Sequence, residues 1–168
     1  MIPQNTGTII DFVYGGALAD RGEYPWMVLV EIKRDGNDDQ FCGGALITTH
    51  HVVTAGHCLK PPYVYNLEDI AIRLGVLRRS ASSDENMVFR AEKMTVHYKF
   101  DSGPIPHPND IGVVKLDRQV TFTGAIYPIC LPKDGESFVG QEARVVGWGL
   151  VNGRSSGKRI INSSFLIT

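Results

Sequence analysis

The residues best suited to chemistry in this sequence are a histidine and an aspartate, each next to an apolar run. His57 is flanked by small residues, so its imidazole is expected to be fixed yet exposed, as a general base near neutral pH requires. Asp110 directly precedes a strongly apolar stretch and is expected to be partly buried, where a carboxylate needs a charged or hydrogen-bonding partner. An imidazole held by that carboxylate would be fixed in one tautomer and favoured when protonated. Alone, each residue also fits an ordinary loop position, and the Pro-Asn context favours that simpler interpretation for Asp110.

Two cysteines accompany the histidine. Cys58 directly follows His57, and Cys42 precedes a pair of glycines on an expected strand. A bond between them would close a loop of about 16 residues, tie the histidine turn to that strand and stabilise the fold by about 3 kcal/mol. The alternative is a metal site made of Cys42, His51, His57 and Cys58, which lacks the two-residue ligand spacings of zinc motifs. The disulfide is favoured, and it leaves Cys130 unpaired.

Short strands are the elements that must position these residues. Residues 70–74 alternate between apolar and polar or small side chains, which is typical of a half-buried strand. Residues 55–59 fit a single helical turn, ended by Pro61 and Pro62. Strand-length runs separated by turn residues predict an all-β fold, either an antiparallel barrel or a sandwich. The expected strands are 26–32, 41–47, 52–54, 70–74, 87–96 and 111–116.

The C-terminal part of the sequence predicts a long connection and then a second sheet. Residues 117–140 carry few strand signals and several prolines and glycines. Residues 143–149 start a new strand, but only about twenty residues follow, and those from 152 to 159 are polar. The sequence therefore predicts a second sheet that is only begun and an irregular tail over residues 150–168.

Composition excludes several functional classes. The chain has 168 residues, of which 43% are apolar and 21% charged, with a net charge of −1, which is not the composition of a disordered chain. No stretch approaches the roughly 18 apolar residues of a membrane span, and no basic stripe indicates nucleic acid. We therefore expect neither a membrane nor a nucleic-acid partner. The start of the chain lacks a signal peptide, so either the protein is cytosolic with reduced thiols or upstream sequence is missing.

Seven segments in a fixed order carry a resemblance to one family. Together they resemble the trypsin-like, chymotrypsin-fold serine proteases, and most closely the secreted arthropod members of the clip type. The resemblance covers residues 13 to about 149, and Gly56 departs from the commoner Ala with little expected consequence. The segments are Val13–Gly16, Tyr24–Trp26, Phe41–Ile47, Thr54–Cys58, Asn109–Leu116, Pro128–Pro132 and Val145–Gly149.

The resemblance implies a fold of two six-stranded antiparallel barrels with the active site between them. The first barrel would be essentially complete and the second only begun, within a peptidase domain that occupies residues 13–149 after a 1–12 remnant of an upstream or pro region. The resemblance also implies that His57 is the general base of a His-Asp-Ser triad and that Asp110 orients this histidine. No cofactor or metal is expected, and Val76 stands where calcium-binding members often have Glu.

The same resemblance exposes what this sequence does not contain. The family's Gly-Asp-Ser-Gly-Gly-Pro motif is absent, so the chain looks truncated before the catalytic serine. Gly153–Gly157 matches the G-x-S-x-G elbow but lacks the flanking buried strand and helix, which indicates a chance match. Family activation cuts before the residue matching Val13, yet Phe12 replaces the usual Arg or Lys. Cys130 matches a cysteine that often bonds upstream of this cut, and the first twelve residues contain none.

Three functions follow, in decreasing order of support. The first is a secreted, extracellular serine endopeptidase acting on protein or peptide substrates, with inhibitors and an upstream activating protease as partners, although this chain without its serine is expected to be inactive. The second is a non-catalytic protease homologue acting as a binding or regulatory module. The third is a metal or redox protein built on Cys42, His57 and Cys58, which an intramolecular Cys42–Cys58 bond would exclude. The Asn162 glycosylation sequon is a weaker signal in the same tail.

Overall fold

The computed structural model describes residues 17–33, 40–80, 87–101, 103, 107–149 and 160–167. Within these residues the fold is all-β, as the sequence predicts, and its helical segments are two short turns. Neither of these turns has the length or the apolar character needed to cross a membrane. The elements are β1 (Ala17–Leu18), β2 (Met27–Ile32), β3 (Gln40–Leu46), β4 (His51–Thr54), η1 (His57–Leu59), η2 (Leu67–Asp69), β5 (Ile70–Leu74), β6 (Val88–Val96), β7 (Gly112–Leu116), β8 (Glu142–Gly147) and β9 (Ile161–Leu166).

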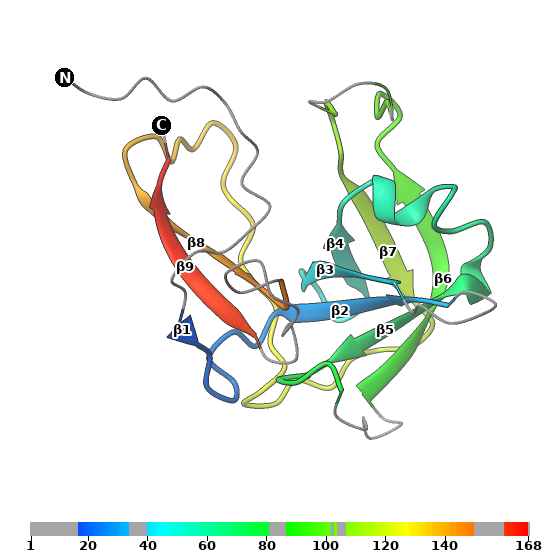
Figure 1. The fold of residues 1–168 in the computed structure, drawn as a ribbon, viewed down its shortest axis with the longest axis horizontal. Coiled ribbons are helices and arrows are strands. Elements are labelled where there is room, and N and C mark those ends of the chain that lie inside the picture. Colours follow the sequence, from blue (N-terminus) through cyan, green and yellow to red (C-terminus); the bar gives the residue numbers. More distant parts are fainter. Residues whose placement is uncertain are drawn as a thin grey trace.

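Six strands form a closed antiparallel barrel in the order β2-β3-β4-β7-β6-β5 (Figure 1). Side chains alternate along each strand, so one set from every strand fills the interior. From β2, Val28, Val30 and Ile32 enter this interior and pack with Leu74 and Val114. All of these side chains are almost completely excluded from solvent, which makes the barrel the main hydrophobic core of the described chain.

The expectation of a half-buried β5 is wrong, because all five of its residues are buried. The outward side of β5 carries Ala71 and Arg73, at 8% and 7% exposure. Arg73 can be buried because its guanidinium donates to the Glu31 carboxylate on the neighbouring strand β2, at 2.5 Å, and also to the backbone oxygen of Arg79. A buried cation needs such partners, and the alternation of residue types along β5 does not reveal them.

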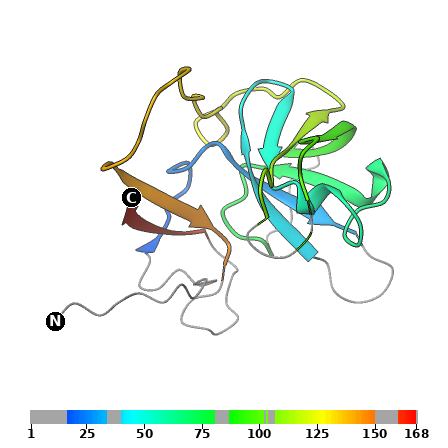
Figure 2. The same ribbon diagram turned by 90° about the horizontal axis from the view of Figure 1, so that it is seen from above.

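A second, three-stranded sheet has the order β1-β9-β8 and lies beside the barrel (Figures 1 and 2). Its middle strand corrects the expectation of an irregular tail over residues 150–168, because Ile161–Leu166 pairs along the full length of β8. On its other side β9 pairs with β1, joining Ala17 to Asn162. The sequence prediction missed β9 because its central residues, Asn162, Ser163 and Ser164, are polar and its pairing partner β1 is far away in sequence.

A smaller apolar cluster joins the sheet to the barrel. Trp148, directly after β8, is buried together with Ile160, and both pack with Leu29 and Met27 on the outer side of β2. Strand β2 is therefore buried on both faces. The expected connection over 117–140 is also observed: within it, only an isolated bridge between residues 123 and 126 is strand-like. Backbone hydrogen bonds hold this connection against the barrel, among them the one from Ile129 N–H to the Leu46 oxygen.

Candidate functional site

The barrel itself brings the candidate base together with the aspartate that is expected to orient it. Strands β4 and β7 are antiparallel neighbours, and the last residue of β4, Thr54, pairs with the first residue of β7, Gly112. His57 comes three residues after Thr54 and Asp110 two residues before Gly112. The two side chains are 53 positions apart in sequence, but they must leave the same end of the same strand pair. The register of β4 and β7 therefore brings the two side chains together, and this register cannot be read directly from the sequence.

Local structure then fixes the histidine backbone. After β4 the chain makes the 3-10 turn η1, whose residues Cys58 and Leu59 are buried while His57 stays exposed. Cys58 is bonded to Cys42 on β3, with a Cα–Cα distance of 6.4 Å. The turn is therefore attached to the barrel by a covalent bond at Cys58 and by the apolar burial of Leu59. The ring itself keeps 47% of its side-chain surface accessible.

Both oxygens of Asp110 contact the same histidine. Its Oδ2 lies 2.7 Å from His57 Nδ1, and its Oδ1 accepts the His57 backbone N–H at 2.8 Å. Burial opposes ionisation of this carboxyl, but the hydrogen bonds from the ring and backbone of His57, with a weaker one from the Gly56 backbone, hold its pKa below the ordinary value. A carboxylate can only accept, so Nδ1 carries the proton and Nε2 of the neutral ring is left as a base.

Gly56 has less free space than the sequence suggests. A Cβ placed there would lie 3.2 Å from Asp110 Oδ1 and from the backbone nitrogen of Ile111, and 3.0 Å from Val96 Cγ1. The carboxylate therefore approaches the backbone closely at a residue with no side chain. The expectation that an Ala-to-Gly difference here has little consequence overlooks this contact.

The imidazole has two further contacts among the described residues. Cys58 Sγ lies 3.3 Å from His57 Nε2, and the Tyr63 ring meets the imidazole edge-on, with ring centroids 6.1 Å apart. That the disulfide sulfur lies next to the unprotonated ring nitrogen could not be predicted from the sequence. His57 and Cys58 are adjacent in the sequence, which was the available signal for this contact. The contact could not be predicted from adjacency alone, because it depends on the directions of the His57 and Cys58 side chains on the 3-10 turn.

The alternative metal site is not formed. The ligand atoms of Cys42, His57 and Cys58 lie within 4.8 Å of one another, and no further His, Cys, Asp or Glu of the described residues joins this group. Both sulfurs are consumed in the disulfide and cannot act as thiolate ligands. His51 lies apart, with its Nδ1 bonded to Thr48 Oγ1 at 2.9 Å. The Cys42–Cys58 disulfide also excludes the expected alternative of a metal or redox protein built on Cys42, His57 and Cys58.

The remaining predicted positions are dispersed. Cys130 is exposed and has no disulfide partner in the described part of the chain. Phe12, Val13 and the Gly153–Gly157 match lie outside the described residues. Asn162 of the sequon is in the middle strand of the second sheet, where its side-chain nitrogen donates to the Ala17 oxygen at 3.4 Å.

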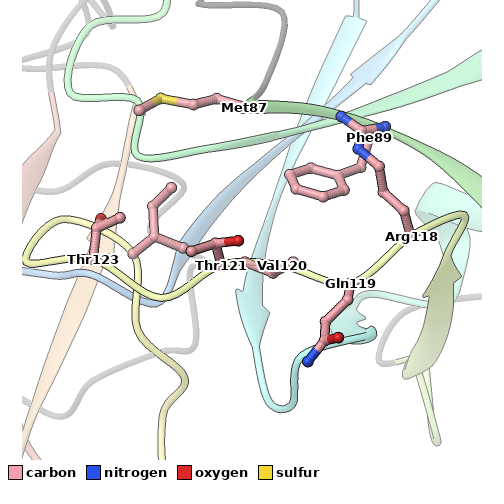
Figure 3. A pocket seen from close by; sticks show the side chains of 8 residues that line it. Met87, Phe89, Arg118, Gln119, Val120, Thr121 and Thr123 are labelled. Carbon is pink, nitrogen blue, oxygen red and sulfur yellow. The ribbon is translucent and has the colours of Figure 1, made fainter.

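A cavity of about 310 Å³ lies between the start of β6 and the connection after β7 (Figure 3). Phe89 and Ile126 form part of its apolar wall and Arg118 borders it. The Arg118 guanidinium lies 4.3 Å from the Phe89 ring centroid and donates to the Asp117 carboxylate. The cation of Arg118 therefore already has partners within the protein. Neither His57 nor Asp110 lines the cavity, so the cavity is separate from the candidate site.

The all-β barrel and the histidine held by an aspartate can now be compared with known proteins. A sequence model of the family described as Trypsin matches residues 13–163. This chain belongs to the trypsin family, as the resemblance of its motifs indicates. A solved structure described as "Structure of GrC" superposes with a TM-score of 0.75 and 26% identity, over 90% of this chain and 64% of that one.

Several curated relatives from arthropods are similar in sequence. Spaetzle-processing enzyme of Drosophila melanogaster is 32% identical over 160 residues, covering 83% of this chain and 40% of that protein. Venom peptide isomerase heavy chain of Agelenopsis aperta is 34% identical, covering 88% and 59%. Proclotting enzyme of Tachypleus tridentatus is 33% identical, covering 86% and 40%. This chain thus spans between two fifths and three fifths of the length of these relatives.

Proposed function

We propose that this chain carries the general-base half of a trypsin-like serine endopeptidase. The observation that carries the proposal is the double contact between Asp110 and His57, which fixes the imidazole with Nδ1–H toward the carboxylate and Nε2 available as a base. In peptide hydrolysis, Nε2 would take the proton of a serine hydroxyl as that oxygen attacks the carbonyl, and would then give the proton to the leaving amine. Asp110 would hold the ring and stabilise the imidazolium formed between these two steps.

The family's nucleophile is the serine of a Gly-Asp-Ser-Gly-Gly-Pro motif, and the 168 residues do not contain this motif. Because this chain spans only part of its relatives' length, we propose that a Gly-Asp-Ser-Gly-Gly-Pro segment encoded outside these residues provides it. The groups that stabilise the oxyanion and select the substrate side chain would come from the same segment. Proteins or peptides are the proposed substrates.

Location and activation belong to the same proposal. A disulfide next to the base, on a partly exposed strand, is typical of proteins in oxidising compartments, so the protein is proposed to act outside the cell. Cleavage before Val13 would have to follow Phe12, which calls for an activating protease that accepts an aromatic residue. N-terminal sequencing of the active form would check this bond.

The test uses the natural full-length product. We expect it to be labelled by a serine-directed fluorophosphonate probe and to hydrolyse peptides. His57→Ala should lower kcat by at least roughly 10⁴-fold, because the base is removed from a group of residues that act as a unit. His51→Ala is the matched control and should retain activity, since that imidazole bonds Thr48 instead. A natural product that is stable yet never labelled would instead support the non-catalytic homologue, and undiminished hydrolysis by His57→Ala would remove His57 from the mechanism.

A further inference from the structure

The segment that follows the candidate base carries a lysine whose ammonium has no acidic partner in the described part of the chain. Lys60 comes three residues after His57, and its backbone N–H donates to the His57 oxygen at 3.4 Å. Its side chain is exposed, and none of the ion pairs among the described residues includes it. Asp101, on the neighbouring loop, instead accepts the Gly103 backbone N–H. The Lys60 ammonium can therefore donate its three N–H groups to an acceptor from another molecule.

An aromatic ring holds this ammonium in place. Lys60 Nζ lies 5.3 Å from the centroid of the Phe100 ring, which is a cation–π contact. Phe100 is 7% exposed, and its ring meets the His107 ring edge-on, with centroids 6.4 Å apart. The Phe100 ring is thus a fixed support for the cation. A side chain that is already ordered in this way loses less conformational entropy when it binds a partner.

Both halves of the cation–π contact lie beside the histidine–aspartate pair. Tyr63, three residues after Lys60, places its ring against the His57 imidazole. Phe100 lies on the segment after β6, and β6 pairs with β7, the strand that follows Asp110. A polypeptide that brings a peptide bond to His57 therefore passes close to the Lys60 ammonium.

We propose that Lys60, supported by Phe100, selects an acidic side chain of the substrate close to the cleaved bond. This inference rests on the proposed endopeptidase function, because it concerns the substrate of the same site. A carboxylate complements the charge of an ammonium that pairs with no acid of the described residues. The methylene stem of Lys60 offers apolar contact to the rest of the bound side chain. Because the ion pair would be partly exposed to water, it produces a moderate preference and not an absolute requirement.

The first test measures substrate preference with the natural full-length product. Starting from a peptide that this product cleaves, glutamate and glutamine are placed in turn at each position flanking the cleaved bond, and kcat/KM is measured at low salt. We expect glutamate to be preferred about fivefold at one of these positions, which is the effect of a good exposed ion pair. The preference should shrink at high salt, because exposed charges are screened. Equal rates with glutamate and glutamine at every position would overturn the proposal.

Variants then assign the preference to one side chain. Lys60→Gln should bring the glutamate-to-glutamine ratio of kcat/KM to about one, and Lys60→Glu should reverse it in favour of glutamine. Lys133→Gln is the matched control, because it removes the same charge from an exposed lysine in the connection after β7 and should keep the wild-type ratio. If the preference survives in Lys60→Glu, or falls equally in Lys133→Gln, another group or the net charge causes it and the proposal is wrong.

Binding to the 168-residue chain separates this inference from the proposed hydrolysis. The isotope-labelled chain is titrated with acetyl-Ala-Glu-Ala-amide or with its glutamine counterpart, and the backbone amide resonances are followed. We expect the glutamate peptide to shift the amides of Lys60 and Tyr63 more than the glutamine peptide does, and this difference to disappear in Lys60→Gln. A full-length product that hydrolyses no peptide would contradict the endopeptidase proposal, while the titration would still decide whether Lys60 binds a carboxylate. Identical shifts with the two peptides would overturn the inference.

Discussion

The closed barrel and the three-stranded sheet show two ways in which the same chain builds β-structure. In the barrel every strand has two partners, and β2 and β5 have almost no exposed residue. In the sheet only β9 has two partners, and β8 presents exposed or half-exposed residues along its whole length. Val145 of β8 is 47% exposed, whereas Val114 of β7 is completely buried.

This difference locates the candidate chemistry. His57 and Asp110 extend from β4 and β7, and the disulfide ties η1 to β3, so every described contact that fixes the pair belongs to the barrel. The positioning of the candidate base therefore depends on the better-packed region. The sheet is joined to the barrel by the apolar cluster in which Trp148 and Ile160 pack on the outer face of β2.

The largest expected effect comes from removing the covalent link that only the barrel possesses. Replacing Cys42 and Cys58 together by Ala should lower the free energy of unfolding by about 3 kcal/mol, because the denatured chain regains the entropy of a loop of about 16 residues. Cys130→Ala is the control and should change little, since this thiol is exposed. Urea denaturation of both variants measures the difference, and an equal loss would contradict the assignment.

A matched pair of valines tests the packing contrast directly. Val114→Ala should cost about 2 kcal/mol of unfolding free energy, from two buried carbon groups and the cavity left behind. Val145→Ala should stay within about 0.5 kcal/mol, because nearly half of that side chain is already in water. Thermal or urea unfolding of the two variants gives the comparison. Equal losses would mean that the exposed face of β8 is covered in solution.

The acid side of the stability profile should reveal the histidine–aspartate contact. The pKa of Asp110 is lower in the folded chain than in the unfolded one, where it is about 4. Its contribution is therefore complete above about pH 4 and is lost as the pH falls through the lower folded value. Asp110→Asn should flatten that part of the curve, measured as urea midpoints between pH 2 and 7. Some acid sensitivity will remain, because Asp69 and Glu23 also have lowered pKa values from backbone hydrogen bonds.

The smallest expected effect is at Gly56. Its backbone has φ −64° and ψ −38°, which Ala adopts easily. An added Cβ must nevertheless displace its close neighbours, Asp110 Oδ1 among them, by a few tenths of an ångström. We expect Gly56→Ala to cost less than about 1 kcal/mol and to shift the His57 Nδ1 proton resonance. Gly43→Ala has open space around its Cβ and should leave that resonance unchanged.

Sequence reasoning succeeded where residue type and local pattern determine structure. The bounds of β5, the turn at η1 and the start of the second sheet follow from apolar runs and their breakers. It failed where structure depends on a partner far away in the sequence. Arg73 is buried because it pairs with Glu31, and β9 forms because it pairs with β1 on one side and β8 on the other. The proximity of His57 and Asp110 came from family motifs, while the contact with Cys58 Sγ required coordinates.

Pairing between β1 and β9 sets an order of assembly during synthesis. The barrel has all its strands once Leu116 has left the ribosome, but Ala17 must wait for Asn162, 145 residues later. Contacts across so long a separation form late, because the intervening loop must close first. Strand β1 is thus made before the barrel strands and is secured after them. Pulse-labelled hydrogen exchange during refolding should show β4 and β7 amides protected before those of β1.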